Sequence, residues 1–396
     1  MAGPLEGYRI VDLTAMISGP IATMMLGDQG ADVIKVEPPG SGDLVRGIGA
    51  SANGMAPLFV TSNRSKRSIV IDLKQRRGVE ILGRLVATAD VFVQNFRPGA
   101  ADRMGVGVDA MRAIKPDLIY VSISGFGETG PYANKRVYDP VIQALSGLAS
   151  IQGDRATGRP RMVRTVVPDK LTAVTAAQAI TAALLARERT GIGQHVRLSM
   201  LDAMVSFLWP EGMMRYTFVR PDELERRPGV PQKLDLVFET ADGYITAGTV
   251  ADREWAGFAR AVGHPELIDD ERFSTGAARI ANWDERLALM GEFLRTATTA
   301  VWLERLDAER VPCGPINTRR DLLTDPQIAA NELIVESEHP IVGRVRQTRP
   351  AARFERTPAE IRRPAPALGE HTDEVLASIG LDGDQIEELR IADVIG

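Results

Sequence analysis

The chain has 396 residues, a net charge of −5, 44% hydrophobic residues and one cysteine, Cys313. This length predicts roughly two to three domains at ~150 residues each, and the hydrophobic content is ordinary for a globular protein. The negative net charge argues against a protein that binds nucleic acid or an anionic membrane. A single cysteine supports neither a disulfide framework nor a cysteine-based metal site, which fits a reducing compartment.

The chain shows no segment typical of secretion or of a membrane span. Its first residues, MAGPLEGYRIVDLT, lack a basic start followed by an apolar run, so we expect no signal peptide. The stretch AVTAAQAITAALLA is shorter than the roughly 20 apolar residues that a span needs. We therefore expect a cytoplasmic protein without a membrane partner.

Apolar, β-rich runs alternate with helical patterns through the first half of the chain. Strands are predicted at YRIVDLT, DVIKVE, RSIVIDLK, DVFVQNF and LIYVSISGF, and helices at PIATMMLGDQG and GVEILGRLVATA. Strands of near-continuous apolar character are buried on both faces. The repetition predicts an α/β fold with a mostly parallel sheet covered by helices, and ligands bind such sheets beyond the carboxyl ends of the strands.

The second half predicts a smaller domain within the larger one. A long Ala-rich helix is expected from Asp169 to about Arg189, then a strand at GQHVRLSM and a helix at LDAMVSFLW. The polar, Pro-rich stretch RPDELERRPGVPQK is interpreted as a linker, and LDLVFETADGYITAGT predicts a hairpin with an Asp242-Gly243 turn. We expect a large domain in residues 1–221, a small α+β domain in 222–328 and a return to the large domain in 329–396.

Several common site motifs are not supported. GFGETG has dinucleotide-binding spacing, but Pro131 follows it where that fold needs an opening helix. The chain lacks a G-x-S-x-G elbow, which disfavours an α/β-hydrolase. Cys313 has no histidine nearby in sequence and is interpreted as a structural thiol. No metal site is expected, because no i, i+4 pair occurs among the four histidines, His195, His264, His339 and His371.

Basic residues recur beside the predicted strand ends, at Lys74, Arg97, Arg103, Lys135 and Arg136. Singly, each is best interpreted as solvated surface. Together, on one side of a parallel sheet, they suit a phosphate-bearing ligand. Phe96 is either a core residue or a platform on which a base stacks.

The stretch RTVVPDKLTAV places Asp169 just after Pro168, where the long helix begins. Taken alone, Asp169 is interpreted as the helix N-cap, because aspartate is among the best N-cap residues. The alternative is a carboxylate placed for chemistry, and the two roles are compatible. At its ordinary pKa of ~3.9 the group is ionised at neutral pH, and the helix N-terminus is expected to keep it so.

Long stretches of the chain resemble the class III coenzyme A transferases, a family that includes the α-methylacyl-CoA racemases. They span residues 5 to about 390 in the family's order. The matching stretches are VDLTAMISGPIATMMLGDQGADVIKVEPPGSGD, NRSKRSIVIDLK, ADVFVQNFRPGAADRMG, ISGFGETGPY, GQHVRLSMLDA, VPCGPINTRRDLLTDPQ and APALGEHTDEVLASIGL.

The resemblance implies a Rossmann-like large domain, a smaller α+β domain, and an interlocked homodimer. It implies a coenzyme A thioester as substrate, with no separate cofactor. Asp169 falls at the family's nucleophile, and Asp139 matches an acidic residue near the thioester. The positions implied to bind CoA are Ile17, Ser18, Ile71, Lys74, Asn95, Phe96, Arg97, Arg103, Arg136, Val137 and Tyr138.

Two departures from the family pattern bear on the substrate. The turn TAMISGP replaces the His and Gln of some relatives, so Ile17 and Ser18 are expected to offer mainly backbone contacts. Pro38 stands where formyl-CoA transferase has arginine, and the glycine run of that enzyme is absent from PGVPQKLDLVFETADG. Pro38 removes one phosphate contact, and the missing glycine run disfavours the formate/oxalate pair.

The leading hypothesis is a transferase that moves CoA from an acyl-CoA to a free carboxylic acid, through an aspartyl anhydride and an aspartyl-CoA thioester on Asp169. One alternative is an α-methylacyl-CoA racemase, which needs a histidine and an aspartate around the α-carbon. Tyr138 occupies the racemase histidine position. The other alternative is a non-catalytic CoA-binding protein, against which the intact Asp169 argues.

Overall fold

The computed structural model describes residues 2–154, 157–219 and 235–396. The chain forms two compact units, unit 1 from Met1–Glu211 with Glu332–Gly396, and unit 2 from Gly212–Asn331. The stretch interpreted as a linker, RPDELERRPGVPQK, lies outside the described residues.

Unit 1 is built on a six-stranded parallel sheet with strand order β3-β2-β1-β4-β5-β6. Its strands are β1 (Arg9–Asp12), β2 (Asp32–Glu37), β3 (Lys66–Val70), β4 (Val91–Gln94), β5 (Ile119–Ser124) and β6 (His195–Ser199). The prediction of a parallel α/β sheet is confirmed, and the order is that of the Rossmann fold. The order reverses between β1 and β4, which are neighbours in the sheet but not in sequence.

Helices cover both faces of this sheet, because its strands carry apolar side chains on both sides. On one face, α1 and α8 pack against residues such as Ile10, Val33 and Val121. On the other, α3, α5, α17 and α18 pack against Val11, Ile34 and Ile69. The helices of unit 1 are α1 (Ser18–Asp28), α2 (Pro57–Ser62), α3 (Arg76–Val86), α4 (Ala100–Arg103), α5 (Val108–Ile114), α6 (Asp139–Leu145), α7 (Leu148–Ile151), α8 (Val167–Thr190), α9 (Met200–Gly212), α17 (Thr372–Ser378) and α18 (Gly383–Ile391).

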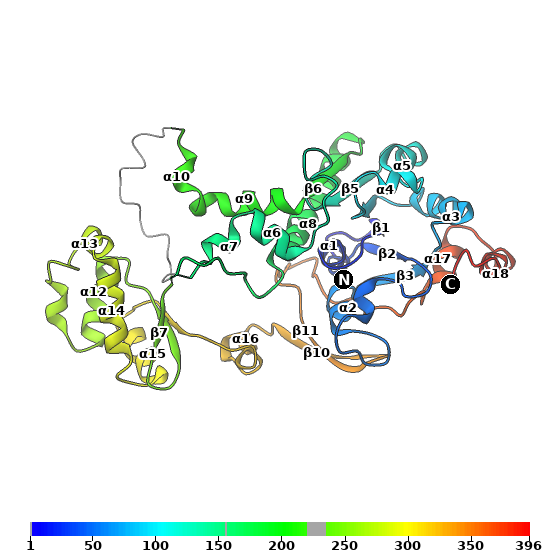
Figure 1. Ribbon diagram of the computed structural model, residues 1–396. Helices are drawn as coiled ribbons and strands as arrows, with labels where there is room; N and C mark the ends of the chain where they lie inside the picture. Colours follow the sequence, from blue (N-terminus) through cyan, green and yellow to red (C-terminus); the bar gives the residue numbers. More distant parts are fainter. Residues whose placement is uncertain (1, 155–156, 220–234) are drawn as a thin grey trace. The chain divides into compact units, whose positions relative to one another are not determined.

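The C-terminal part of the chain belongs to the core of unit 1. Figure 1 shows α17, at the red end of the chain, beside the blue strand β3. Val375, Leu376 and Ile395 are buried in one cluster with Ile69 of β3. A separate antiparallel pair, β10 (Ile334–His339) and β11 (Gly343–Thr348), precedes this segment.

Unit 2 is a smaller α+β unit with its own core. The predicted hairpin is confirmed: Thr240 N–H donates to the Gly243 carbonyl at 2.9 Å, between antiparallel β7 and β8. Trp255, Phe258 and Trp302 lie at the centre of its apolar cluster. Its elements are α10 (Met214–Thr217), β7 (Val237–Glu239), β8 (Tyr244–Ala247), α12 (Asp252–Ala261), α13 (Gly276–Ala281), α14 (Trp283–Leu294), α15 (Thr299–Ala308), β9 (Cys313–Pro315) and α16 (Pro326–Ala330).

Candidate active site

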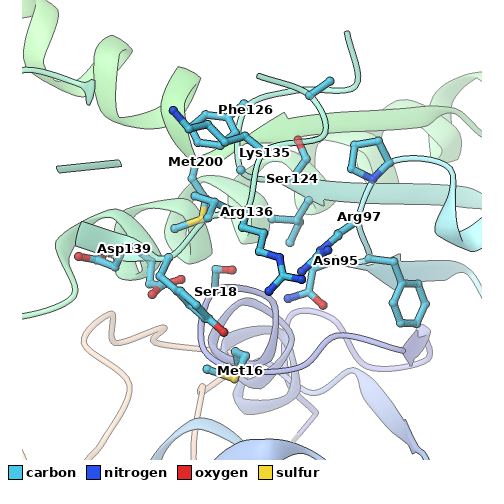
Figure 2. A pocket seen from close by; sticks show the side chains of 18 residues that line it. Met16, Ser18, Asn95, Arg97, Ser124, Phe126, Lys135, Arg136, Asp139 and Met200 are labelled. Atoms are coloured by element: carbon cyan, nitrogen blue, oxygen red, sulfur yellow. Dashed lines mark hydrogen bonds between the residues drawn. The ribbon is translucent and has the colours of Figure 1, made fainter. Parts of the chain in front are cut away.

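A cavity of about 300 Å³ opens beyond the carboxyl ends of β4 and β5, beside the start of α1. We call it the reaction cavity. It lies at the switch point between β1 and β4, where sheets of this order bind ligands. Its lining comes from the turn after β1, the loops after β4 and β5, and the first residues of α6, α8 and α9: Met16, Ser18, Asn95, Phe96, Arg97, Pro98, Ile123, Ser124, Gly125, Phe126, Ala133, Lys135, Arg136, Val137, Tyr138, Asp139, Asp169 and Met200. Figure 2 shows Asp139 on the side opposite Arg97 and Asn95, with Arg136 between them in this view.

The structure brings most of the predicted site residues to this cavity, but not all. Ile71 and Lys74 instead line a second, more apolar cavity of about 340 Å³, together with Phe96 and Met104. Phe96 lines both cavities. Two further predicted residues line neither: Ile17 is the buried N-cap residue of α1, and Arg103 is exposed at the end of α4. The predicted residues that line the reaction cavity are Ser18, Asn95, Phe96, Arg97, Arg136, Val137, Tyr138, Asp139 and Asp169.

Asp169 is not the N-cap of α8, so this prediction is wrong. The helix begins at Val167 with Val166 as its N-cap residue, and no side chain caps it. Pro168 takes the second helical position, which puts Asp169 third, inside the first turn. Its main-chain N–H donates to Asp139 Oδ2 at 3.2 Å, so a carboxylate from α6 satisfies this donor. The Asp169 side chain is thereby left to face the reaction cavity.

Burial and the negative charge of Asp139 raise the pKa of Asp169 to about 6. The expectation of an ordinary pKa is therefore wrong. Removing a carboxylate from water disfavours its charged form, and a neighbouring carboxylate adds to the effect. At neutral pH Asp169 is still mostly ionised, but it is more basic than a solvated aspartate.

Asp139 is 4% exposed and is held by N–H groups on both oxygens. Oδ2 accepts from Asp169 as described, and Oδ1 accepts from Gln143 Nε2 at 2.7 Å. Asp139 and Gln143 lie one turn apart on α6. This acid is therefore a fixed neighbour of Asp169.

The turn after β1 is fixed from several sides by a buried charged network. Asp12 accepts from Thr14 N–H at 2.9 Å, and Lys35 Nζ donates to the Thr14 carbonyl at 2.8 Å. Lys35 also pairs with Asp43 at 2.8 Å, and the other oxygen of Asp43 accepts from Met16 N–H at 3.1 Å. Met16 has a φ of 72°, which costs a non-glycine residue about 1–3 kcal/mol and persists only where neighbours over-determine it.

Asn95 contacts this turn directly. Its Oδ1 accepts from Ala15 N–H at 3.0 Å, and its Nδ2 donates to the Ala15 carbonyl at 2.8 Å. The resemblance implies that Asn95 binds CoA, whereas here both ends of its amide bind the protein's own backbone. Gly19 closes the turn, because a Cβ there would lie 2.3 Å from Cβ of Thr14.

The loop after β5, residues 125–138, carries cations to the rim of the reaction cavity. Gly125 allows this loop to fold back on itself, since a Cβ there would lie 2.4 Å from Val137 Cγ1. Lys135 and Arg136 are exposed and line the cavity, as does Arg97 from the loop after β4. Three cations therefore stand around a cavity that also holds two carboxyl groups.

Sequence reasoning missed Met16, Phe126, Met200 and Gln143. The first three supply apolar surface to the reaction cavity. Gln143 carried a usable signal, because a glutamine four residues after Asp139 on an otherwise apolar helix shares its face. The signal against Asp169 as an N-cap was Pro168, since proline favours the first turn of a helix.

None of the four histidines lines the reaction cavity. Within the described ranges, no group of three or more His, Cys, Asp or Glu side chains is placed to hold a metal ion. No helix in the described part of the chain is long and apolar enough to cross a membrane.

Comparison with known proteins finds relatives along the whole chain. CoA-transferase family III matches residues 5–372. The chain is 36% identical to succinyl-CoA:glutarate CoA-transferase of Mus musculus, over 99% of this chain and 90% of that protein. It is 34% identical to formyl-CoA:oxalate CoA-transferase of Streptomyces coelicolor, over 100% of both chains. A crystal structure of a CAIB/BAIF family protein from Brucella suis matches with a TM-score of 0.83 and 34% identity, over 96% of this chain and 100% of that one.

Proposed function

Since the chain belongs to CoA-transferase family III and is a CoA-transferase, we propose that it moves CoA from an acyl-CoA thioester to a free carboxylic acid, with Asp169 as nucleophile. The observation that carries this proposal is the Asp169 carboxyl group, which lines a cavity at the switch point of the sheet beside exposed cations. A carboxylate suits the reaction because its anhydride is reactive enough to accept CoA again.

The first half of the reaction removes the acyl group from CoA. A carboxylate oxygen of Asp169 attacks the thioester carbonyl, the carbon–sulfur bond breaks, and CoA leaves as a thiolate. The product is a mixed anhydride between the acyl group and Asp169. The thiolate then attacks Cγ of Asp169, the anhydride C–O bond breaks, and the donor acid leaves as a carboxylate. Asp169 now carries CoA as a thioester.

The second half repeats the exchange with the acceptor. Its carboxylate attacks the Asp169 thioester, and CoA thiolate leaves again. The thiolate then attacks the acceptor carbonyl of the new anhydride, which yields the acceptor's CoA ester and restores the Asp169 carboxylate. Every step exchanges one acyl bond for another, so no oxidant, reductant or separate cofactor is needed.

The linings of the two cavities support one placement of CoA. We assign the phosphates of CoA to Arg97, Lys135 and Arg136, because guanidinium and ammonium groups bind phosphate oxygens. The N-terminus of α1, which begins at Ser18 just after Met16, adds partial positive charge to the wall of the reaction cavity. The apolar cavity beside Ile71 and Phe96 suits the adenine ring, with Lys74 at its edge.

The acids are proposed from the relatives. Succinyl-CoA:glutarate CoA-transferases at 36% identity make short dicarboxylic acids the first acceptors to test.

A homodimer is part of the proposal and rests on the family resemblance. It is supported by large apolar side chains that a single chain leaves exposed. On α9, Phe207 is 60% and Trp209 44% exposed. Exposed apolar surface of this kind is typical of association sites.

The proposal is tested with a panel of acyl-CoA donors against carboxylic acids, with products identified by mass. Enzyme mixed with donor alone and then treated with hydroxylamine is expected to carry a hydroxamate on the peptide that contains Asp169. Asp169→Ala is expected to lack both transfer and hydroxamate. Asp202→Asn is the matched control, because Asp202 is also the third residue of its helix and does not line the reaction cavity. Transfer by Asp169→Ala would contradict the proposal.

A further inference from the structure

Gln143 is 2% exposed and has a hydrogen-bond partner at each end of its amide. Its Oε1 accepts from Val163 N–H at 2.9 Å. Its Nε2 donates to Asp139 Oδ1 at 2.7 Å, and to the carbonyls of Val163 and Thr165 at 3.2 Å each. The side chain thus joins α6 to the segment that enters α8.

These partners allow one orientation of the amide. The main-chain N–H of Val163 is a donor, so only Oε1 of Gln143 can face it. Nε2 must then face Asp139. The second oxygen of Asp139 accepts from Asp169 N–H. The two oxygens of Asp139 therefore accept from two different elements, one from Gln143 on α6 and one from Asp169 on α8.

The same side chain fixes where Asp169 lies. Val163 and Thr165 immediately precede the first turn of α8, and Asp169 is the third residue of that helix. Gln143 holds this segment by three main-chain contacts and holds Asp139, which in turn accepts from Asp169 N–H.

We propose that Gln143 is a positioning residue that holds the Asp139 carboxyl group and the segment entering α8 together, so that the Asp139 charge stays beside Asp169. This inference rests on the proposed function of Asp169 as nucleophile. A negative charge fixed beside a carboxyl group disfavours the ionised form of that group. The Asp139 charge then makes Asp169 more basic, and a more basic carboxylate is the stronger nucleophile toward a thioester.

The other charged and titratable groups around Asp169 come from several elements. Arg97, Lys135 and Arg136 line the reaction cavity from the loops after β4 and β5, and Tyr138 lines it at the start of α6. On α8 itself, Lys170 donates to Thr165 Oγ1 at 2.9 Å. The raised pKa of Asp169 has two causes, burial and the charge of Asp139.

The pH profile of kcat/KM tests the inference. In the wild type we expect kcat/KM to rise with pH through about 6, as Asp169 loses its proton. In Gln143→Met, Asp139 and the segment entering α8 lose the side chain that joins them, so the Asp139 charge is no longer held beside Asp169. One of the two causes of the raised Asp169 pKa is then weakened, and Asp169 stays ionised to lower pH. The midpoint is expected to fall by about one pH unit, with a lower plateau.

Gln347→Met is the matched control, because Gln347 on β11 is 7% exposed and bonded to Arg64, outside the reaction cavity. Its midpoint is expected to equal that of the wild type. If Gln143→Met does not fold, Gln143→Asn retains an amide that is too short for the same set of bonds, and it is expected to shift the midpoint in the same direction.

A lower plateau with an unmoved midpoint in the folded Gln143 variant would overturn the inference, because it would show a purely structural role. The hydroxamate on the Asp169 peptide separates this result from failure of the proposed function. A wild type that forms the hydroxamate, with an unmoved midpoint in the variant, rejects the role of Gln143 alone. A wild type that forms none rejects the nucleophile, and this inference with it.

Discussion

Asn95 holds Ala15 by both ends of its side-chain amide, at 3.0 Å and 2.8 Å. The contact joins the loop after β4 to the turn after β1, the two strands on either side of the switch point. The Asn95 amide thus pairs with Ala15 as the backbone of a neighbouring strand would: it accepts one hydrogen bond from the Ala15 N–H and donates one to the Ala15 carbonyl. Asn95 therefore fixes the spacing of two cavity walls.

We expect Asn95→Asp to lower kcat/KM by about 10- to 100-fold. A carboxylate still accepts from Ala15 N–H, but it places an acceptor against the Ala15 carbonyl, which costs about 1–3 kcal/mol for the unpaired groups. The measurement is steady-state kinetics together with the thermal unfolding midpoint. Gln178→Glu, which makes the same chemical change at an exposed side chain of α8 outside the reaction cavity, is expected to leave both unchanged. Unaltered kinetics in Asn95→Asp would contradict a positioning role.

Asp169→Asn is expected to make the protein more stable at pH 7.5 while it abolishes transfer. No side-chain cap is lost, because Asp169 does not cap α8. Its pKa is raised to about 6, so the folded state binds a proton more readily than the unfolded state. That contribution to stability is present below the unfolded pKa of ~3.9 and is lost as pH rises through about 6.

The gain of Asp169→Asn over the wild type is therefore expected to be about 1–3 kcal/mol at pH 7.5 and to shrink toward pH 4. Unfolding midpoints of both proteins at the two pH values give the comparison. Asp202→Asn, the same substitution at the third position of another helix, is the control variant measured alongside. A variant less stable than the wild type at pH 7.5 would indicate that the Asp169 carboxylate has a stabilising partner.

Arg136→Ala is expected to weaken CoA binding about tenfold and to leave pantetheine binding nearly unchanged, because pantetheine lacks the phosphates. The loss for CoA should diminish as salt is raised, since salt screens exposed charges. Calorimetric titration with both ligands measures it. Arg76→Ala, an exposed arginine paired with Glu80 on α3, serves as control. Equal losses for the two ligands would argue against a phosphate contact.

The proposed interlocked homodimer is expected not to exchange subunits on dilution, because such a pair separates only by partial unfolding. Tagged and untagged protein, mixed under native conditions, should form almost no hybrids over a day. The same mixture refolded together from denaturant should form them readily. Hybrids that appear within minutes in native buffer would rule out interlocking.

The sheet was predictable because buried parallel strands are nearly continuous apolar runs, such as Ile10–Val11 and Val91–Phe92–Val93, and these runs alternate with helical patterns. The strand order was not, because hydrophobic pattern alone does not determine which strands become neighbours. The strand order reverses because β4 pairs directly with β1, although β2 and β3 lie between these two strands in the sequence.

Within the candidate site, the charged residues could be predicted from the sequence, but the hydrogen bonds that they make could not. Asp169 was singled out from its place at the start of a long helix and Asp139 from the resemblance, yet the sequence did not show that Asp139 accepts from the main-chain N–H of Asp169. Asn95 was expected to contact a ligand and instead bonds to Ala15. A polar side chain with several possible partners is assigned only when the backbone is in place.

The position of the C-terminal helices in the core of unit 1 affects the order in which the two units fold during translation. Val375, Leu376 and Ile395 complete a cluster whose other members, such as Ile69, leave the ribosome early. Unit 2 is continuous in sequence, at Gly212–Asn331. During translation it is therefore able to fold first, while one face of the unit 1 sheet is covered only by α3 and α5. Nascent chains that lack α17 and α18 should bind chaperones that recognise exposed apolar surface.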